Sequence, residues 1–167
     1  PFEYCHAGQV WQYGQVKIEV LSPQSADLNQ VANNQNELSC VLYIQALQVG
    51  KGYKNFLLMG DAGWEAEYQI LQRYPHLNVD VLVLGHHGSQ YSSSFAFLKQ
   101  LHPKLVIASA GFGNRYHHPS PITLARLQAL KIPLLTTIDQ GTIQFQLDHN
   151  HEMQIREFRS EKTWLRR

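Results

Sequence analysis

Residues 79–89 read VDVLVLGHHGS, an apolar, strand-like run that ends abruptly at two adjacent histidines. Residues 56–61, FLLMGD, have the same design and end at a carboxylate. Asp61 offers hard oxygen atoms, and His86 and His87 offer imidazole nitrogens. This donor set suits Zn²⁺ or Mn²⁺ better than Ca²⁺ or Mg²⁺. Two strand ends can bring such ligands to one edge of a sheet, where a bound metal activates water. Each segment taken alone is read equally well as a plain turn, because turns favour Gly and Asp.

Predicted strands and helices alternate along the chain, which indicates the α/β class with hairpins at both ends. Ser94 and Ser120 are expected helix N-caps, and Pro121 follows at the first helical position. We expect a long polar loop over 22–37 and a frayed tail over 156–167. The predicted strands lie at 16–20, 40–44, 56–59, 79–84, 105–108, 134–135, 142–147 and 154–158, and the first predicted helix lies at 64–73.

The composition is that of a globular chain: of 167 residues, 44% are hydrophobic and 16% are charged. The formal charge of +1 argues neither for nor against a nucleic-acid partner. No apolar stretch approaches the ~20 residues that a membrane span needs. The N-terminus has neither the basic start nor the apolar core of a signal peptide, and it has no initiator Met. We therefore expect a piece of a longer protein.

The two cysteines, Cys5 and Cys40, are too few for a disulfide framework and lack the spacing of a structural zinc site. They can form one disulfide in an oxidising compartment. The alternative is that both are buried free thiols, and the sequence without the family resemblance slightly favours this alternative.

Three motifs together resemble a known family. They are Gly60-Asp61, then HHGS at 86–89 with SSS at 92–94, then GNRYHHP at 113–119. In this order and spacing they resemble the metallo-β-lactamase-like domain at the C-terminal end of the ComEC proteins, which take up DNA through the inner membrane of competent bacteria. Segments 8–11, 20–23 and 39–42 extend the resemblance, so that residues 1–167 are interpreted as one partial domain of this kind.

The resemblance implies an αββα sandwich with a metal site at one edge of the two sheets. It implies a metal-dependent nuclease, proposed to degrade the DNA strand that is not imported, with Mn²⁺ or Zn²⁺ as cofactor. Asp61 matches the acidic ligand that bridges metals and serves in catalysis. His86 matches a late histidine ligand, for which His87 is the alternative. His118 matches a catalytic histidine that protonates the leaving oxygen or orients the phosphate.

Four residues are assigned to the substrate. Ser89 and Ser92 can hold phosphate oxygens before a helix start, or they can serve the cap alone. Asn114 and Arg115 belong to the third motif, and Arg115 either contacts phosphate or stacks on Tyr116.

The chain departs from the family in two respects. Where relatives often have Gly-His-Pro-His-Pro, residues 117–121 read HHPSP, so that Ser120 replaces the second histidine of this loop. The motif His-x-His-x-Asp-His, which supplies most metal ligands in this fold, is absent, and we expect it upstream of Pro1. The fragment alone is therefore expected to bind metal incompletely and to be inactive. Two other functions stay open: a non-catalytic module that binds DNA or a partner, and a hydrolase of a small phosphoester.

The expected partners are DNA and a multi-span membrane channel in the same chain, and no small-molecule ligand is expected. The domain itself is expected to be soluble and to lie in the periplasm, outside the cytoplasm. That location implies a disulfide between Cys5 and Cys40.

Overall fold

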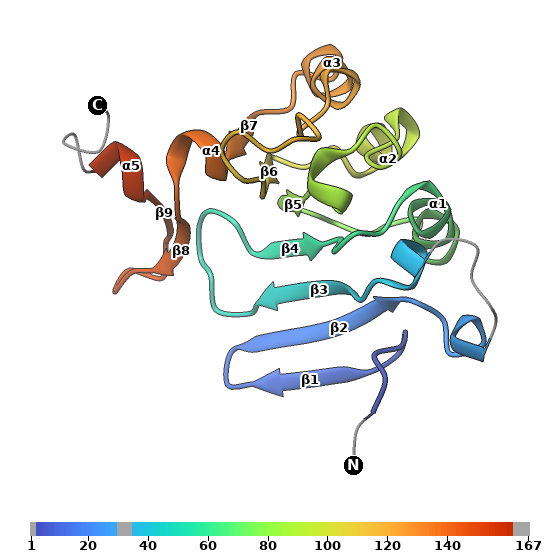
Figure 1. Cartoon of the computed structure of the whole chain (residues 1–167). Coiled ribbons are helices and arrows are strands. Elements are labelled where there is room, and N and C mark those ends of the chain that lie inside the picture. Colours follow the sequence, from blue (N-terminus) through green and yellow to red (C-terminus); the bar gives the residue numbers. More distant parts are fainter. Residues whose placement is uncertain (1–2, 30–34, 162–167) are drawn as a thin grey trace.

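The computed structural model describes residues 3–29 and 35–161. A seven-stranded sheet forms the centre, with its strands in chain order from β1 to β7 (Figure 1). The first four strands pair antiparallel, whereas β4, β5, β6 and β7 pair parallel. The strands are β1 (Val10–Tyr13), β2 (Val16–Ser22), β3 (Val41–Ala46), β4 (Asn55–Leu58), β5 (Val81–Val83), β6 (Leu105–Ala108) and β7 (Leu134–Thr136).

Three helices cover one face of this sheet: α1 (Trp64–Arg73), α2 (Phe95–Leu101) and α3 (Pro121–Ala129) (Figure 1). The bounds of α1 are the predicted ones. The two predicted N-caps are confirmed. The Ser94 hydroxyl accepts a hydrogen bond from the Phe97 amide at 3.2 Å, and the Ser120 hydroxyl accepts one from Thr123 at 3.2 Å.

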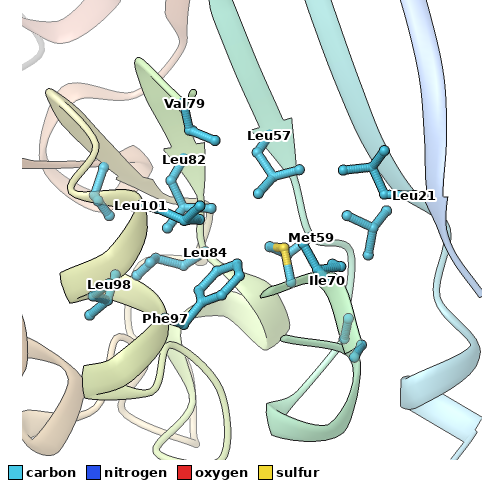
Figure 2. Packing of buried hydrophobic residues seen from close by; sticks show 14 of the residues in the cluster. Leu21, Leu57, Met59, Ile70, Val79, Leu82, Leu84, Phe97, Leu98 and Leu101 are labelled. Carbon is cyan, nitrogen blue, oxygen red and sulfur yellow. The ribbon is translucent and has the colours of Figure 1, made fainter. Parts of the chain in front are cut away.

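The main core lies between the sheet and these helices (Figure 2). Leu57, Leu82 and Val106 from three neighbouring strands point into it, and Ile70 and Phe97 face them from the helices. Each of these side chains is almost completely buried. Burial of a side chain of this size contributes about 1.5–3 kcal/mol, so this layer supplies much of the stability.

The opposite face of the sheet carries a second cluster, because successive side chains of a strand point to opposite faces. Val81, Leu105 and Ile107 lie on this face. A separate antiparallel hairpin, β8 (Ile143–Leu147) and β9 (Met153–Glu157), packs against them. Phe145 of β8 meets the ring of Phe56 edge-on, with the ring centroids 5.0 Å apart. The order helices, sheet, hairpin confirms the α/β class.

Several short elements differ from the prediction. Strand β1 was not predicted, because all four of its residues are exposed and it has no buried alternation. The polar loop contains the short helices η1 (Asp27–Asn29) and η2 (Gln35–Leu38), and residues 30–34 lie outside the described chain. The helix α4 (Thr137–Gln140) occupies part of the segment 139–141, for which the sequence predicts only a turn. The expected frayed tail contains the end of β9 and α5 (Phe158–Glu161), and the rest of it, 162–167, lies outside the described residues.

A disulfide joins Cys5 to Cys40, whose Cα atoms are 6.0 Å apart. This pairing confirms what the family resemblance implied and corrects the slight preference for free thiols. The bond ties the N-terminal segment to the start of β3. In the part of the chain that the structure describes, no helix is long and apolar enough to cross a membrane.

Candidate functional site

The candidate site lies where parallel strands end. Asp61 follows β4, His86 and His87 follow β5, and the 111–118 loop follows β6. Because β4, β5 and β6 are parallel, their carboxyl ends lie at the same edge of the sheet, where open α/β sheets place their ligands. The amide of His86 donates a hydrogen bond to the Gly60 carbonyl at 2.9 Å, which joins the first two motifs directly.

Asp61 and His87 form a pair of possible metal donors. The Oδ1 atom of Asp61 is 3.6 Å from Nε2 of His87. The Nδ1 atom of His87 lies 2.7 Å from the Ser109 carbonyl oxygen, which can only accept a hydrogen bond. Nδ1 therefore carries the proton, and in the neutral ring Nε2 presents its lone pair toward the carboxylate. A backbone carbonyl in this position is the usual outer contact of a metal-bound histidine.

His86 lies beside this pair but is oriented differently. Its Nδ1 atom is 3.4 Å from the side-chain nitrogen of Asn36, on the η2 segment. Its ring centroid is 6.3 Å from that of His87 and 5.9 Å from that of His118. The structure thus gathers three imidazoles, with His87 rather than His86 forming the pair with Asp61.

The backbone of the two histidines is unusual. His86 and His87 have φ values of 47° and 57°, in the left-handed region that non-glycine residues seldom adopt. Two consecutive residues of this kind persist only where the surrounding structure holds them. Left-handed residues cluster at functional sites.

Glu67 of α1 is one of the residues that hold the loop between the two histidines and α2. Its side chain is only 1% exposed, and its two carboxylate oxygens accept the amides of Ser93 and Ser94, the latter at 2.9 Å. Burial raises the pKa of Glu67 to about 7, while the hydrogen bonds from Ser94 and Ser93 and the nearby Arg126 oppose the rise. A buried acid thus fixes the start of α2.

Arg126 of α3 holds the same loop from the other side. Its guanidinium donates to the carbonyl oxygens of Gln90 at 3.2 Å, Ser92 at 2.9 Å and Ser93 at 3.2 Å. It also lies over the ring of Trp64, 5.6 Å from the centroid. The loop that follows the two histidines is therefore clamped between α1 and α3.

The predicted phosphate contacts of Ser89 and Ser92 do not fit their positions. Ser89 is 4% exposed and Ser92 is fully buried. The Ser92 hydroxyl donates to the Gly85 carbonyl at 2.6 Å and lies 3.1 Å from that of Ser89. The Ser89 hydroxyl accepts from the Tyr91 amide at 3.3 Å. Hydroxyls that are buried and already hydrogen-bonded do not meet a phosphate, so both serve the loop instead.

His118 is the third imidazole of the site. Burial, followed by the charges of His86 and His87, lowers the pKa of His118, so the ring is neutral at neutral pH. Its Nδ1 atom is buried and has no hydrogen-bond partner among the described residues. A buried polar atom without a partner is costly and calls for an explanation, such as a ligand or an ion.

The loop that carries His118 is fixed by Asn114. Its side-chain oxygen accepts the His118 amide at 2.8 Å, and its nitrogen donates to the carbonyls of His118 at 2.9 Å and Gly111 at 3.0 Å. Tyr116 stacks on His118 with the centroids 5.7 Å apart. The Arg115 guanidinium lies 4.6 Å from the Tyr116 ring centroid and donates to its hydroxyl. Arg115 thus stacks on Tyr116, one of its two expected contacts.

A cavity of about 490 Å³ opens beside these groups. Its volume is within the range of ~300–1,000 Å³ typical of ligand sites. Two imidazoles, His87 and His118, face it together. The lining residues are His87, Ser109, Ala110, Gly111, Asn114, Tyr116, His118 and Thr137.

The metal donors in the described chain are few. Across residues 3–29 and 35–161, no group of three or more His, Cys, Asp or Glu side chains could hold a metal ion. The 3.6 Å gap between Asp61 and the His87 ring is the nearest approach to such a site. A carboxylate and an imidazole are donor types that Zn²⁺ and Mn²⁺ accept, and two donors are fewer than the three or four protein ligands of a zinc site.

Comparison with known proteins finds competence and recombination proteins among the relatives of this chain. The chain is 38% identical over 143 residues to the ComE operon protein 3 of Bacillus subtilis, covering 86% of this chain and 17% of that protein. It is 37% identical over 142 residues to the competence protein ComA of Neisseria gonorrhoeae, covering 84% and 19%. It is 31% identical over 141 residues to the recombination protein 2 of Haemophilus influenzae, covering 84% and 16%.

The chain belongs to the ComEC-related competence proteins. No family model matches it. The chain spans less than a fifth of the length of these relatives.

Two residues that support the site of this ComEC-related domain were missed by the sequence analysis. Ser39 accepts a hydrogen bond from the Asp61 amide at 3.1 Å and thereby holds the carboxylate loop against the start of β3. Glu67 lies in the first turn of α1, and the sequence analysis assigned it no role. Its place on the same helical face as Ile70 was the available signal, because an acid on an apolar stripe is expected to be buried and bonded.

Proposed function

We propose that this chain is part of a metal-dependent phosphodiesterase, a nuclease domain of a DNA-uptake protein. The observation that carries the proposal is the pair formed by Asp61 and His87, in which Ser109 fixes the imidazole tautomer and His118 lies on the same cavity. The names of the relatives, which refer to competence and recombination, support DNA as the substrate.

In this proposal each residue has a defined role. Asp61 and His87 would hold Mn²⁺ or Zn²⁺, with the imidazole of His86 beside them. When bound, such an ion lowers the pKa of a water molecule and neutralises charge on the phosphate. Asp61 has two oxygen atoms and can serve two ions. The remaining ligands would come from outside the described residues, as the absent His-x-His-x-Asp-His motif implies.

His118 would act on the substrate. A neutral imidazole carries one N–H donor and one acceptor, so it can hydrogen-bond a phosphate oxygen or take part in proton transfer. Its unpartnered, buried Nδ1 atom supports a role in which substrate or metal supplies the missing partner. Asn114 would position it, and Arg115 would be available to phosphate at the exposed edge of the loop.

The fold proposal is a metallo-β-lactamase-like αββα sandwich. The helix layer, the mixed sheet and the hairpin on the opposite face support it, since they match one half of such a sandwich with a start of the second sheet. We further propose that the parent lies in the inner membrane with this domain in the periplasm. The disulfide supports that location, because disulfides persist in oxidising compartments.

Other activities are supported by single observations. A cavity of about 490 Å³ would also accept a small phosphoester. A module that binds DNA or a protein partner without catalysis is favoured by the small donor set of Asp61 and His87. The assays described next distinguish these two candidates from the nuclease.

The test compares the complete parent domain with the 167-residue chain in nuclease assays containing Mn²⁺ or Zn²⁺. We expect cleavage of DNA by the complete domain only, and its loss in Asp61→Ala, because the bridging carboxylate positions both ions. Glu65→Ala, an exposed acid four residues away, is the control and should cleave normally.

Cleavage of bis-p-nitrophenyl phosphate but not of DNA would favour the small-substrate hydrolase. DNA binding without cleavage in either metal would favour the binding module. Robust cleavage by the 167-residue chain, lost in Asp61→Ala, would show that the ligand set is complete within it.

A further inference from the structure

We propose that Phe112 is a stacking residue for an unpaired nucleobase, placed on the rim of the Asp61–His118 site. This inference rests on the proposed function for the position of the phosphate strand. It goes further in assigning a base-contacting residue, since no residue considered above contacts a base.

Phe112 has an exposure that the fold does not explain. It is 83% exposed, the highest value among the large hydrophobic side chains of the described chain. Gly111 and Gly113 flank it, and a Cβ atom at either glycine would meet nothing within 4 Å. The ring therefore stands at the tip of a loop, surrounded by solvent and contributing little to the core.

Phe112 lies next to residues that line the cavities of the candidate site. Gly111, immediately before it, lines the 490 Å³ cavity together with His87 and His118. Gly113, immediately after it, lines a second cavity of about 500 Å³, which shares Asn114 and His118 with the first. Both neighbours of Phe112 therefore line cavities that His118 also lines, which places Phe112 on the rim of the site.

Other exposed rings near the site are already engaged. Tyr116 stacks on His118, and the Arg115 guanidinium lies over the Tyr116 ring. Trp64 meets Tyr91 edge-on, with centroids 6.2 Å apart. In the described part of the chain, by contrast, neither a ring nor a cation lies against Phe112, so its faces are open.

An open aromatic face beside a phosphate site is the arrangement that proteins use to bind unpaired nucleotides. Every base has a π-face, so stacking tolerates any sequence, and loss of one ring weakens binding about 5- to 150-fold. Arg115, in the same loop, adds positive charge of the kind that follows a nucleic-acid backbone. Paired bases inside a duplex do not offer this face.

The test measures binding, needs no metal and does not depend on cleavage. The 167-residue chain is titrated at low salt with two fluorescein-labelled probes: an oligothymidylate of about 12 nucleotides, and an abasic strand of equal length and charge. We expect the wild type to prefer the oligothymidylate. Phe112→Leu should weaken that binding about 5- to 150-fold while leaving abasic binding unchanged.

Tyr13→Leu provides the matched control. Tyr13 is 67% exposed and lies on β1, at the opposite edge of the sheet from β6 and β7. Its loss should change neither affinity. The proposal is overturned if Phe112→Leu binds oligothymidylate as well as the wild type does, if it loses affinity for both probes equally, or if the chain binds neither probe. None of these results decides whether the complete domain cleaves DNA, so the two proposals fail separately.

Discussion

Replacement of Glu67 by glutamine tests the physical description of the loop that follows the two histidines. Glu67 is buried, and its two oxygens each accept a backbone amide, from Ser93 and from Ser94. Glutamine has the same shape but only one oxygen, so one amide loses its acceptor. An unsatisfied buried N–H costs about 1–3 kcal/mol at any pH.

The pH dependence of the unfolding free energy provides a second, independent test. The pKa of Glu67 rises to about 7 from an ordinary value of 4.5. Between these values the folded protein keeps a proton that the unfolded chain has lost, so stability falls as pH rises through this window. At about 1.4 kcal/mol per pH unit, the carboxyl costs the folded state about 3 kcal/mol above pH 7 relative to below pH 4.5. Glutamine does not titrate, and the Glu67→Gln protein should lack this slope.

The assay is urea unfolding of the wild type and the variant at several pH values from 4.5 to 8. The difference in unfolding free energy between the two proteins removes the contribution of every other titrating group. We expect this difference to change by about 3 kcal/mol across the window, with the wild type losing stability relative to the variant as the pH rises. Glu65→Gln, on the exposed side of α1, should follow the wild type. Parallel stability curves for wild type and Glu67→Gln would refute the argument that burial keeps this carboxyl protonated.

Two further predictions concern the site and the disulfide. In the complete domain, His118→Ala should slow DNA cleavage about 10²- to 10⁴-fold if the imidazole transfers a proton. Elemental analysis should show an unchanged metal content, and the variant of the exposed His117, His117→Ala, is the control that should stay active. Loss of metal from His118→Ala would show that His118 is a metal ligand instead. Replacement of both Cys5 and Cys40 by serine should lower the unfolding free energy by about 4 kcal/mol, the loop-entropy value for their separation of 35 residues. Wild type reduced with dithiothreitol should show the same loss in urea unfolding, and equal stability of reduced and oxidised protein would contradict the role of the bond.

Several elements could be predicted because their signals are local. The bounds of α1 follow from helical spacing with Pro75 beyond its end, and the two serine caps follow from their position before apolar helical runs. The strand before His86 is a short apolar run of the buried type, and parallel strands in an α/β chain place their carboxyl ends together. The sequence alone could therefore bring Asp61, the two histidines and His118 to one edge of the sheet.

The sequence by itself determined the α/β class, the helix caps and the residue types that gather at the strand ends, because these depend on side-chain periodicity and local hydrogen bonding. Only the tertiary structure decided which imidazole faces Asp61. That choice depends on the left-handed backbone at His86 and His87 and on the Ser109 carbonyl, which lies 22 residues farther along the chain. It also decided that Ser89 and Ser92 are buried while Phe112 is exposed. Burial is set by what packs over a residue, and the covering helices come from distant parts of the chain.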